Sequence, residues 1–217
     1  MIAAGLLLIV VPLAFNAAFA ALAARFDYPD VLRHPTHEVL AKFRDGGRPL
    51  VLLWWGFALT AVAMVPLVVL LSHAVDDADA GLLQVATTVG VIAALVQFLG
   101  LIRWPFLVPY LAGQPDSEAV DLVFQAFNRY LGVAVGEHLG YLLTGAWTTL
   151  IGVALTQTAQ VPAAIGAAGI VIGPLLLVCS LEFVVSARGW KLAERLTPIA
   201  YVLWSAWLIA TGVAILA

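Results

Sequence analysis

Uninterrupted apolar runs of about 20 residues recur along this sequence, and they constrain its fold more than any other feature. A run of this length lets an α-helix cross about 30 Å of hydrocarbon, where only helices and closed barrels satisfy every backbone polar group. The strand-like alternation that a barrel needs is absent. Of the 217 residues, 63% are hydrophobic and 11% are charged, against about 25% charged in a soluble domain. The sequence therefore predicts an all-α integral membrane protein.

We expect one domain, residues 1–217, built as a bundle of six transmembrane helices. The first apolar run is predicted to be a helix rather than a signal peptide, because no Lys or Arg precedes it and it is longer than a signal core. The predicted spans are Ile2–Ala24, Leu50–Ser72, Gly81–Ile102, Tyr130–Thr156, Ala163–Ala187 and Pro198–Leu216.

The basic residues predict how the bundle is oriented. All ten Lys and Arg residues lie in the first, third and fifth loops. The second loop carries three aspartates and the fourth, TQTAQVP, carries no charge. By the positive-inside rule the odd loops are cytoplasmic and both termini are extracytoplasmic. We therefore expect a multi-pass protein of the plasma membrane.

Two stretches of the cytoplasmic loops predict short helices on the membrane surface. In RHPTHEVLAKFRDGG, Pro35 and Thr36 are typical of a helix start, and the glycines at 46 and 47 of a stop. In QPDSEAVDLVFQAFNRY, Asp116 or Ser117 is a suitable cap for a helix that continues into the fourth span.

The segment RWPFLVPYLAG follows the third predicted span. Its two prolines predict an irregular conformation, because proline interrupts a helix. Trp104 and Tyr110 are predicted to lie at the level of the lipid headgroups, like most of the seven tryptophans.

Five polar side chains inside the spans lie at similar predicted depths. At about 1.5 Å of rise per residue, counted from the nearest basic residue, all five are about 9–14 Å inside the cytoplasmic boundary. A charged side chain facing lipid there would cost about 2–3 kcal/mol, so we expect them to face the bundle interior and one another. They are Asn16, Gln97, Glu137, His138 and Glu182.

Small residues in the fourth span predict close helix packing. Gly132, Gly136 and Gly140 recur every four residues, a spacing at which a neighbouring helix can approach. Tyr141 shares a helix face with Glu137. The fifth span, with three glycines of its own at 166, 169 and 173, is the expected partner.

The sequence gives little support for a metal site or a catalytic site. His138 is the one histidine inside a span, which disfavours a haem held by two histidines, and HPTH lacks a cysteine nearby for zinc. Ser180 beside Glu182 is too weak a pattern for a hydrolase. We therefore predict no metal ligand and no catalytic residue, and the sequence indicates no cofactor.

Four stretches together resemble one family of small polytopic membrane proteins. They are FDYPDVLRHPTHEVLAKFRDGG, LVQFLGLIRWPFLVPYLA, FQAFNRYLGVAVGEHLGYLLTGAWT and YVLWSAWLIATGVAIL. The sequence resembles the bacterial, largely actinobacterial, family known as domain of unknown function 4386, over nearly its whole length. The resemblance implies a helical protein of the bacterial inner membrane and supplies no functional residue.

These features predict a polar pocket inside the membrane that opens to the cytoplasm and binds a lipid-like or small amphipathic ligand, for sensing or transport. The predicted partners are membrane lipid, a hydrophobic small molecule, and a second copy or another membrane protein, with no nucleic acid. A structural or regulatory subunit is the alternative, with a membrane-embedded enzyme third. The candidate ligand-binding residues are Asn16, Gln97, Arg103, Trp104, Arg129, Glu137, His138, Tyr141 and Glu182.

Overall fold

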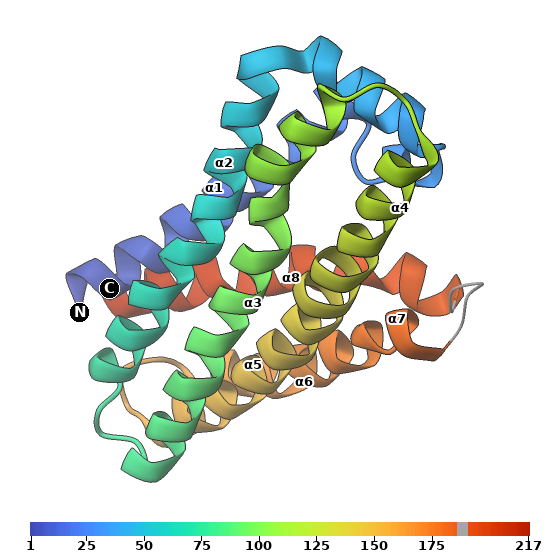
Figure 1. Cartoon of the computed structure of the whole chain (residues 1–217). Helices are drawn as coiled ribbons and strands as arrows, with labels where there is room; N and C mark the ends of the chain where they lie inside the picture. The colour runs from blue at the N-terminus through green and yellow to red at the C-terminus, as the bar shows by residue number, and fades with distance from the viewer. Residues whose placement is uncertain (186–190) are drawn as a thin grey trace.

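A computed structural model describes residues 1–185 and 191–217, and every element in them is a helix (Figure 1). Six of these helical segments are long and apolar enough to cross a membrane, which confirms the predicted all-α bundle. The predicted end of the fifth span, Ala187, lies outside the described residues. In chain order the elements are α1 (Ile2–Phe26), η1 (Asp30–Arg33), α2 (Thr36–Ala74), α3 (Ala80–Ala112), α4 (Glu118–Phe127), η2 (Asn128–Leu139), α5 (Gly140–Gln157), α6 (Ala163–Ser180), α7 (Glu182–Val185) and α8 (Lys191–Leu216).

Both predicted short helices are present. The first forms the start of α2 and is separated from the membrane-crossing part by Gly47, whose φ of 54° and ψ of −153° interrupt the helix. The second is α4, where the Ser117 hydroxyl accepts a hydrogen bond from the Val120 N–H (3.3 Å). We call the end of the bundle formed by η1, the start of α2 and α4 the basic end (Figure 1).

The prediction of an irregular segment around the two prolines is wrong. Helix α3 continues through Pro105 and Pro109 to Ala112. Each proline removes one N–H donor, and neighbouring side chains can compensate for such losses in a membrane helix. Packing also holds this segment, because Trp104 is fully buried in the core at the basic end.

Most of the described tryptophans are buried among other side chains of the bundle, and Trp190 lies outside the described residues. Trp54 and Trp104 are stacked with ring centroids 4.4 Å apart, and Phe26 and Phe43 pack around Trp104. The buried tryptophans are Trp54, Trp104, Trp147, Trp204 and Trp207, whereas Trp55 is 46% exposed. Contacts with other rings therefore hold most of these indoles inside the bundle.

Glycines set the closest helix contacts. A Cβ added at Gly136 of η2 would lie 2.8 Å from the Cα of Gly100 on α3, so these two backbones touch. The row of glycines at 132, 136 and 140 therefore faces α3. Helix α6, the expected partner, packs on α5 through a separate pair, since a Cβ at Gly145 would lie 2.6 Å from the Gly173 carbonyl oxygen.

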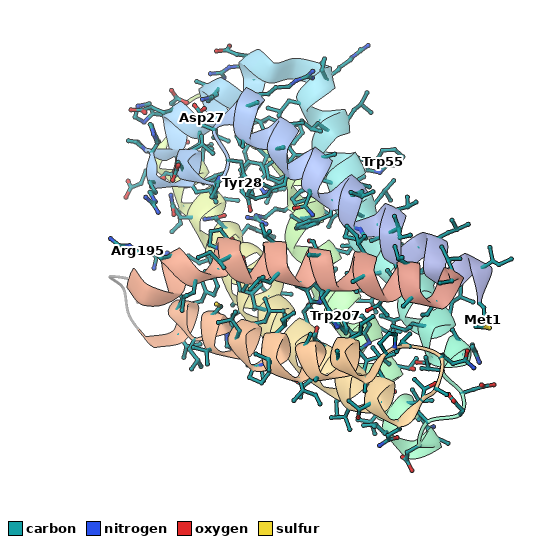
Figure 2. All side chains as sticks on the ribbon, turned by 180° about the vertical axis from the view of Figure 1, so that it is seen from behind. Met1, Asp27, Tyr28, Trp55, Arg195 and Trp207 are labelled. Atoms are coloured by element: carbon teal, nitrogen blue, oxygen red, sulfur yellow. The ribbon has the colours of Figure 1, made fainter. Side chains whose placement is uncertain are left out.

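Helices α1 and α8 approach each other at one end of the molecule only. Near the termini the two backbones touch, because a Cβ at Gly212 would lie 2.7 Å from the carbonyl oxygen of Gly5. Figure 2 shows the two helices together near Met1 and apart near Tyr28 and Arg195. The interior at the basic end is therefore covered by side chains of α1 and α8 rather than by a direct backbone contact.

The loops at the opposite end contact each other. The Asp77 carboxylate, between α2 and α3, accepts hydrogen bonds from the Thr158 hydroxyl (2.5 Å) and the Ala159 N–H (3.3 Å), between α5 and α6. The hydrogen bond from Thr158 holds the pKa of Asp77 below its ordinary value. The acidic second loop and the uncharged fourth loop thus lie on one side of the bundle.

Enlarging Gly136 is expected to destabilise the protein. In Gly136→Ala the new methyl group meets the backbone of Gly100, which has no side chain to move aside, so overpacking should cost about 1–3 kcal/mol. Gly56→Ala is the matched control, because nothing lies within 4 Å of a Cβ at Gly56. Thermal unfolding in detergent should show a lower Tm for Gly136→Ala and an unchanged or higher Tm for Gly56→Ala. Equal Tm values would contradict this packing.

Candidate functional site

Two of the predicted polar side chains connect neighbouring helices. The Asn16 side chain of α1 donates to the Ser205 hydroxyl of α8 (3.0 Å) and to the carbonyl of Pro12 (2.7 Å). The Gln97 side chain of α3 donates to the Thr144 hydroxyl of α5 (2.9 Å). Hydrogen bonds between membrane helices contribute about 1 kcal/mol each. Asn16 and Gln97 are therefore occupied in joining helices.

His138 connects η2 to the end of α6. Its Nδ1 lies 2.9 Å from the carbonyl oxygen of Ser180. A carbonyl can only accept, so Nδ1 carries the proton and donates it. Glu182, two residues beyond Ser180 at the start of α7, interacts electrostatically with Glu137.

Arg103 is buried and its guanidinium is held on several sides. It donates to the Gly100 carbonyl and to the Asn128 side-chain oxygen (2.9 Å), and it lies 5.3 Å from the Trp104 ring centroid. A Cβ at Gly132 would lie 2.5 Å from a guanidinium nitrogen, so the glycine provides the space for Arg103. Arg129, the other predicted rim residue, is exposed.

Glu137 and His138 lie in a π-helix. Element η2 spans Asn128–Leu139, twelve residues, between the α-helical segments α4 and α5. π-Helical segments are rare and occur frequently at functional sites. In the sequence nothing distinguishes this segment from an α-helix, so the π-helix was not predicted.

Glu137 has no hydrogen-bond or ion-pair partner in the described part of the chain. Its carboxyl interacts electrostatically with Arg103 and Glu182 at a longer range. It also interacts electrostatically with three tyrosines of separate elements: Tyr28, which follows α1, Tyr141 on α5 and Tyr201 on α8. Glu137 is therefore the common centre of a polar cluster, which we define as Glu137, Tyr28, Tyr141 and Tyr201.

Aromatic contacts hold the tyrosines of this polar cluster. The rings of Tyr141 and Tyr201 meet edge to face with centroids 5.0 Å apart, and Phe15 of α1 stacks on Tyr201 at 6.0 Å. Tyr28 packs edge to face on Trp54 at 5.0 Å. These contacts are made by the rings and do not involve the hydroxyl groups.

The tyrosine hydroxyls also lack protein partners. None of the three makes a hydrogen bond to any residue whose side chain the structure describes, 1–184 and 195–217. All four side chains of the cluster are half-buried rather than sealed in the core. Burial, followed by the nearby Glu137 carboxyl, holds the pKa of Tyr28 above its ordinary value, so its hydroxyl is protonated. The cluster thus contains four polar groups that have no hydrogen-bond partner in the described part of the chain.

Sequence reasoning identified only half of this cluster. Glu137 is predicted from its depth in the fourth span, and Tyr141 from its spacing to Glu137 on the same helix. Tyr28 and Tyr201 are more than 100 positions apart in the chain, and neither carries a local signal that relates it to Glu137. Only the arrangement of the helices brings them together.

Two cavities open at the basic end, and neither includes the polar cluster. One, of about 510 Å³, lies between the start of α2 and α4 and is lined by Thr36, His37, Asp116, Glu118 and Asp121 among others. The other, of about 240 Å³, is lined by Asp27, Val31, His34, Glu38 and Lys42. The predicted pocket around Glu137 therefore stays a prediction.

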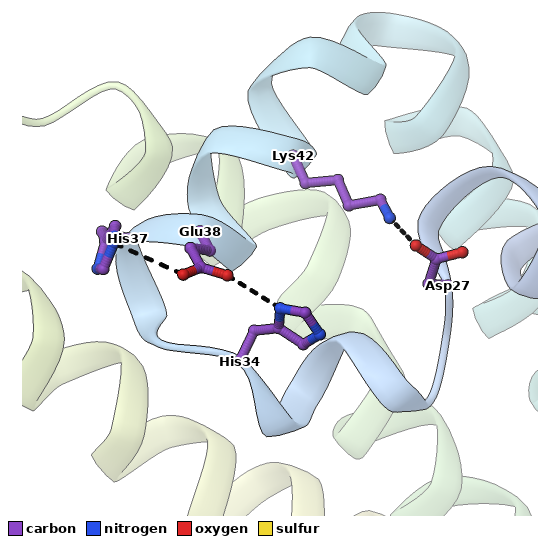
Figure 3. A network of polar contacts seen from close by, with 5 residues as sticks. All are labelled: Asp27, His34, His37, Glu38 and Lys42. Atoms are coloured by element: carbon purple, nitrogen blue, oxygen red, sulfur yellow. Dashed lines mark hydrogen bonds and ion pairs between the residues drawn. The ribbon is translucent and has the colours of Figure 1, made fainter.

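The smaller cavity is bordered by an exposed polar network (Figure 3). Glu38 lies 2.9 Å from His34 Nδ1 and 4.0 Å from His37 Nε2, and Lys42 pairs with Asp27. Among the described residues no three His, Cys, Asp or Glu side chains are arranged to hold a metal ion. The network joins η1 to the start of α2.

The fold and the polar cluster define a helical multi-pass membrane protein with ionisable side chains between its helices. The chain belongs to the family described as domain of unknown function (DUF4386), which matches residues 3–212. No curated protein and no solved structure matches it. The family carries no assigned activity, so the function is argued from the residues.

A double-mutant cycle on Gln97→Leu and Thr144→Val tests the connection between α3 and α5. Each single substitution leaves one buried polar group without its partner, so the double variant should be more stable than the sum of the single losses predicts. We expect a coupling of about 0.5–1.5 kcal/mol by unfolding in detergent. A coupling of zero would show that this hydrogen bond does not stabilise the protein.

Proposed function

We propose that the protein binds an amphipathic ligand inside the membrane, between η2, α1 and α8 and around Glu137. The observation that carries this proposal is the polar cluster, in which a carboxyl and three hydroxyls have no hydrogen-bond partner among the residues whose side chains the structure describes. Buried polar groups in native proteins are almost always hydrogen-bonded, and intramembrane ionisable residues commonly mark functional sites. A ligand with a polar head would supply the missing partner.

The proposal also rests on the elements that form the cluster. In the described residues, η2 packs mainly on α3, α4, α5, α6 and α7. Tyr28 and Tyr201 reach toward Glu137 from α1 and α8. Their side chains are half-buried rather than sealed in the core.

This proposal uses fewer residues than the sequence predicted. Asn16, Gln97 and His138 connect helices, and the guanidinium of Arg103 is held by Gly100 and Asn128. Glu137 and Tyr141 remain as ligand-binding candidates, and the cluster adds Tyr28 and Tyr201. Of the others, His138 and Arg103 are then positioning residues that hold η2 against α6 and α3, whereas Asn16 and Gln97 join other pairs of helices.

We also propose that the protein is a single domain of a bacterial plasma membrane, with the basic end in the cytoplasm. In a Cys179→Ala background, cysteine at Asp76 should react with an impermeant thiol reagent added outside intact cells, and cysteine at His37 should not. Both positions are exposed, so accessibility is matched and only the side of the membrane differs. Labelling of His37→Cys with Asp76→Cys protected would reverse the orientation.

Replacing Glu137 with Gln or with Leu separates ligand binding from stability. Glu137→Gln keeps the shape and removes the charge, so it should lower retention of a co-purifying molecule about tenfold, or about 1.4 kcal/mol, with little loss of Tm. Glu137→Leu should lose the molecule as well. Native mass spectrometry and thermal unfolding measure the two effects.

The structural alternative makes the opposite prediction for the same variants. If Glu137 serves only helix packing, Glu137→Gln behaves like the parent protein in both measurements, because it keeps the shape of the side chain. That pattern would contradict the proposed binding function. Glu118→Gln, an exposed carboxylate of α4, is the matched control and should change neither measurement.

A further inference from the structure

Large apolar side chains are exposed at the basic end, on the last turns of α3, on α4 and at the start of η2. The two helices lie side by side there, because the ring of Trp104 on α3 meets the ring of Phe124 on α4 with 6.4 Å between centroids. Proteins surrounded by water rarely expose so many large apolar side chains together. We define the α3–α4 surface as Phe106 (68% exposed), Tyr110 (67%), Leu122 (69%), Val123 (37%), Phe127 (42%) and Tyr130 (68%).

Helix α4 has two chemically different faces. At 3.6 residues per turn, Ala119, Leu122 and Ala126 lie on one side of the helix, and all three are exposed and uncharged. This side is opposite Phe124, which is buried. The outward face of α4 is therefore apolar along its whole length.

The acidic residues of α4 are directed to α2 instead. The Thr36 hydroxyl of α2 donates a hydrogen bond to the Asp121 carboxylate and accepts one from the Gln125 side chain (3.0 Å). Glu118 and Asp121 also line the larger of the two cavities, between α2 and α4. Charge and apolar surface are thus separated around α4, as in helices that lie at a membrane surface.

Helix length brings this surface to the edge of the bilayer. Helix α3 has 33 residues and is therefore about 50 Å long, whereas the hydrocarbon is about 30 Å thick and the bilayer with its headgroups about 40–45 Å. Helix α4 continues through η2 into α5, and Glu118–Gln157 is one of the six candidate spans (Figure 1). Arg103 does not mark the boundary, because it is buried inside the bundle. The lipid-covered surface can therefore extend past Arg103 to the end of α3.

We propose that the α3–α4 surface binds lipid at the boundary between headgroups and acyl chains, and that Arg129 binds the lipid phosphate. Arg129 is exposed and makes no hydrogen bond or ion pair within the described residues. Its guanidinium can bind a phosphate with two parallel hydrogen bonds. Tyr110 and Tyr130 have the amphipathic rings that are enriched at this level of a membrane.

A second copy of the chain fits this surface less well. In a two-fold dimer the same surface of both subunits meets, which would bring two Arg129 side chains together. The carboxylates of Glu118 and Asp121, which could compensate these charges, line the cavity toward α2. Lipid satisfies both requirements, since its acyl chains cover the apolar side chains and its phosphate neutralises the arginine.

The test compares the two faces of α4 with a fluorescent label. Leu122→Cys and Glu118→Cys, each in a Cys179→Ala background, carry an environment-sensitive NBD group. Both parent side chains are exposed, so the two positions are matched for labelling. The protein is reconstituted in vesicles of phosphatidylcholine and phosphatidylglycerol. Lipids brominated near the headgroup should quench the label at position 122 several times more strongly than the label at position 118, and aqueous iodide should do the reverse.

Two outcomes would overturn the lipid surface. Equal quenching of both labels by iodide would place the outward face of α4 in water. Protection of the label at position 122 from both quenchers would show that protein covers this face, as in a complex with a second copy.

The role of Arg129 is tested with the same label at position 122. Arg129→Gln should lower the apparent affinity of brominated phosphatidylglycerol about fivefold, or about 1 kcal/mol, the contribution of one arginine near an anionic surface. Arg129→Lys keeps the charge and should lose less. Arg48→Gln removes an exposed arginine of α2 and is the matched control. An unchanged affinity in Arg129→Gln, or an equal loss in Arg48→Gln, would overturn the assignment of the phosphate to Arg129.

Discussion

A polar group inside a bilayer needs a partner, and this requirement accounts for the helices and for several contacts between them. The backbone meets it by forming helices in all the described membrane-crossing segments. Side chains meet it across helices, as in the hydrogen bonds of Asn16 to Ser205 and Gln97 to Thr144. The glycine contacts are what bring these side chains within reach of one another, because the helices approach until their backbones touch.

The same requirement distinguishes the residues that hold the fold from those available for function. Asn16, Gln97 and His138 have partners in neighbouring helices, and Arg103 is held against η2 by Asn128. Glu137 lies within the same bundle and has none among the described residues. An ionisable group is expensive to place there, so a site that leaves it unpaired is explained by a ligand more readily than by packing.

The membrane spans follow from the apolar runs because their length is fixed by the bilayer, and the two short helices follow from the caps at Ser117 and the stop at Gly47. Rules that use only the neighbouring residues gave a wrong prediction where packing between helices determines the conformation. Proline alone predicts a break, yet α3 continues past Pro105 because Trp104 is buried against α2.

Two of the four residues of the polar cluster could be predicted from the sequence. Glu137 and Tyr141 share a helix, whereas Tyr28 and Tyr201 reach it only through the crossing of α1, α8 and η2.

The central claim is that a non-protein molecule occupies the space between Glu137 and the cluster tyrosines. A density map of the protein in lipid nanodiscs tests it most directly. The account predicts density larger than a water molecule, within hydrogen-bond distance of the Glu137 carboxyl and of at least one tyrosine hydroxyl. A closed interior, in which Glu137 hydrogen-bonds to protein side chains or to water alone, would contradict it.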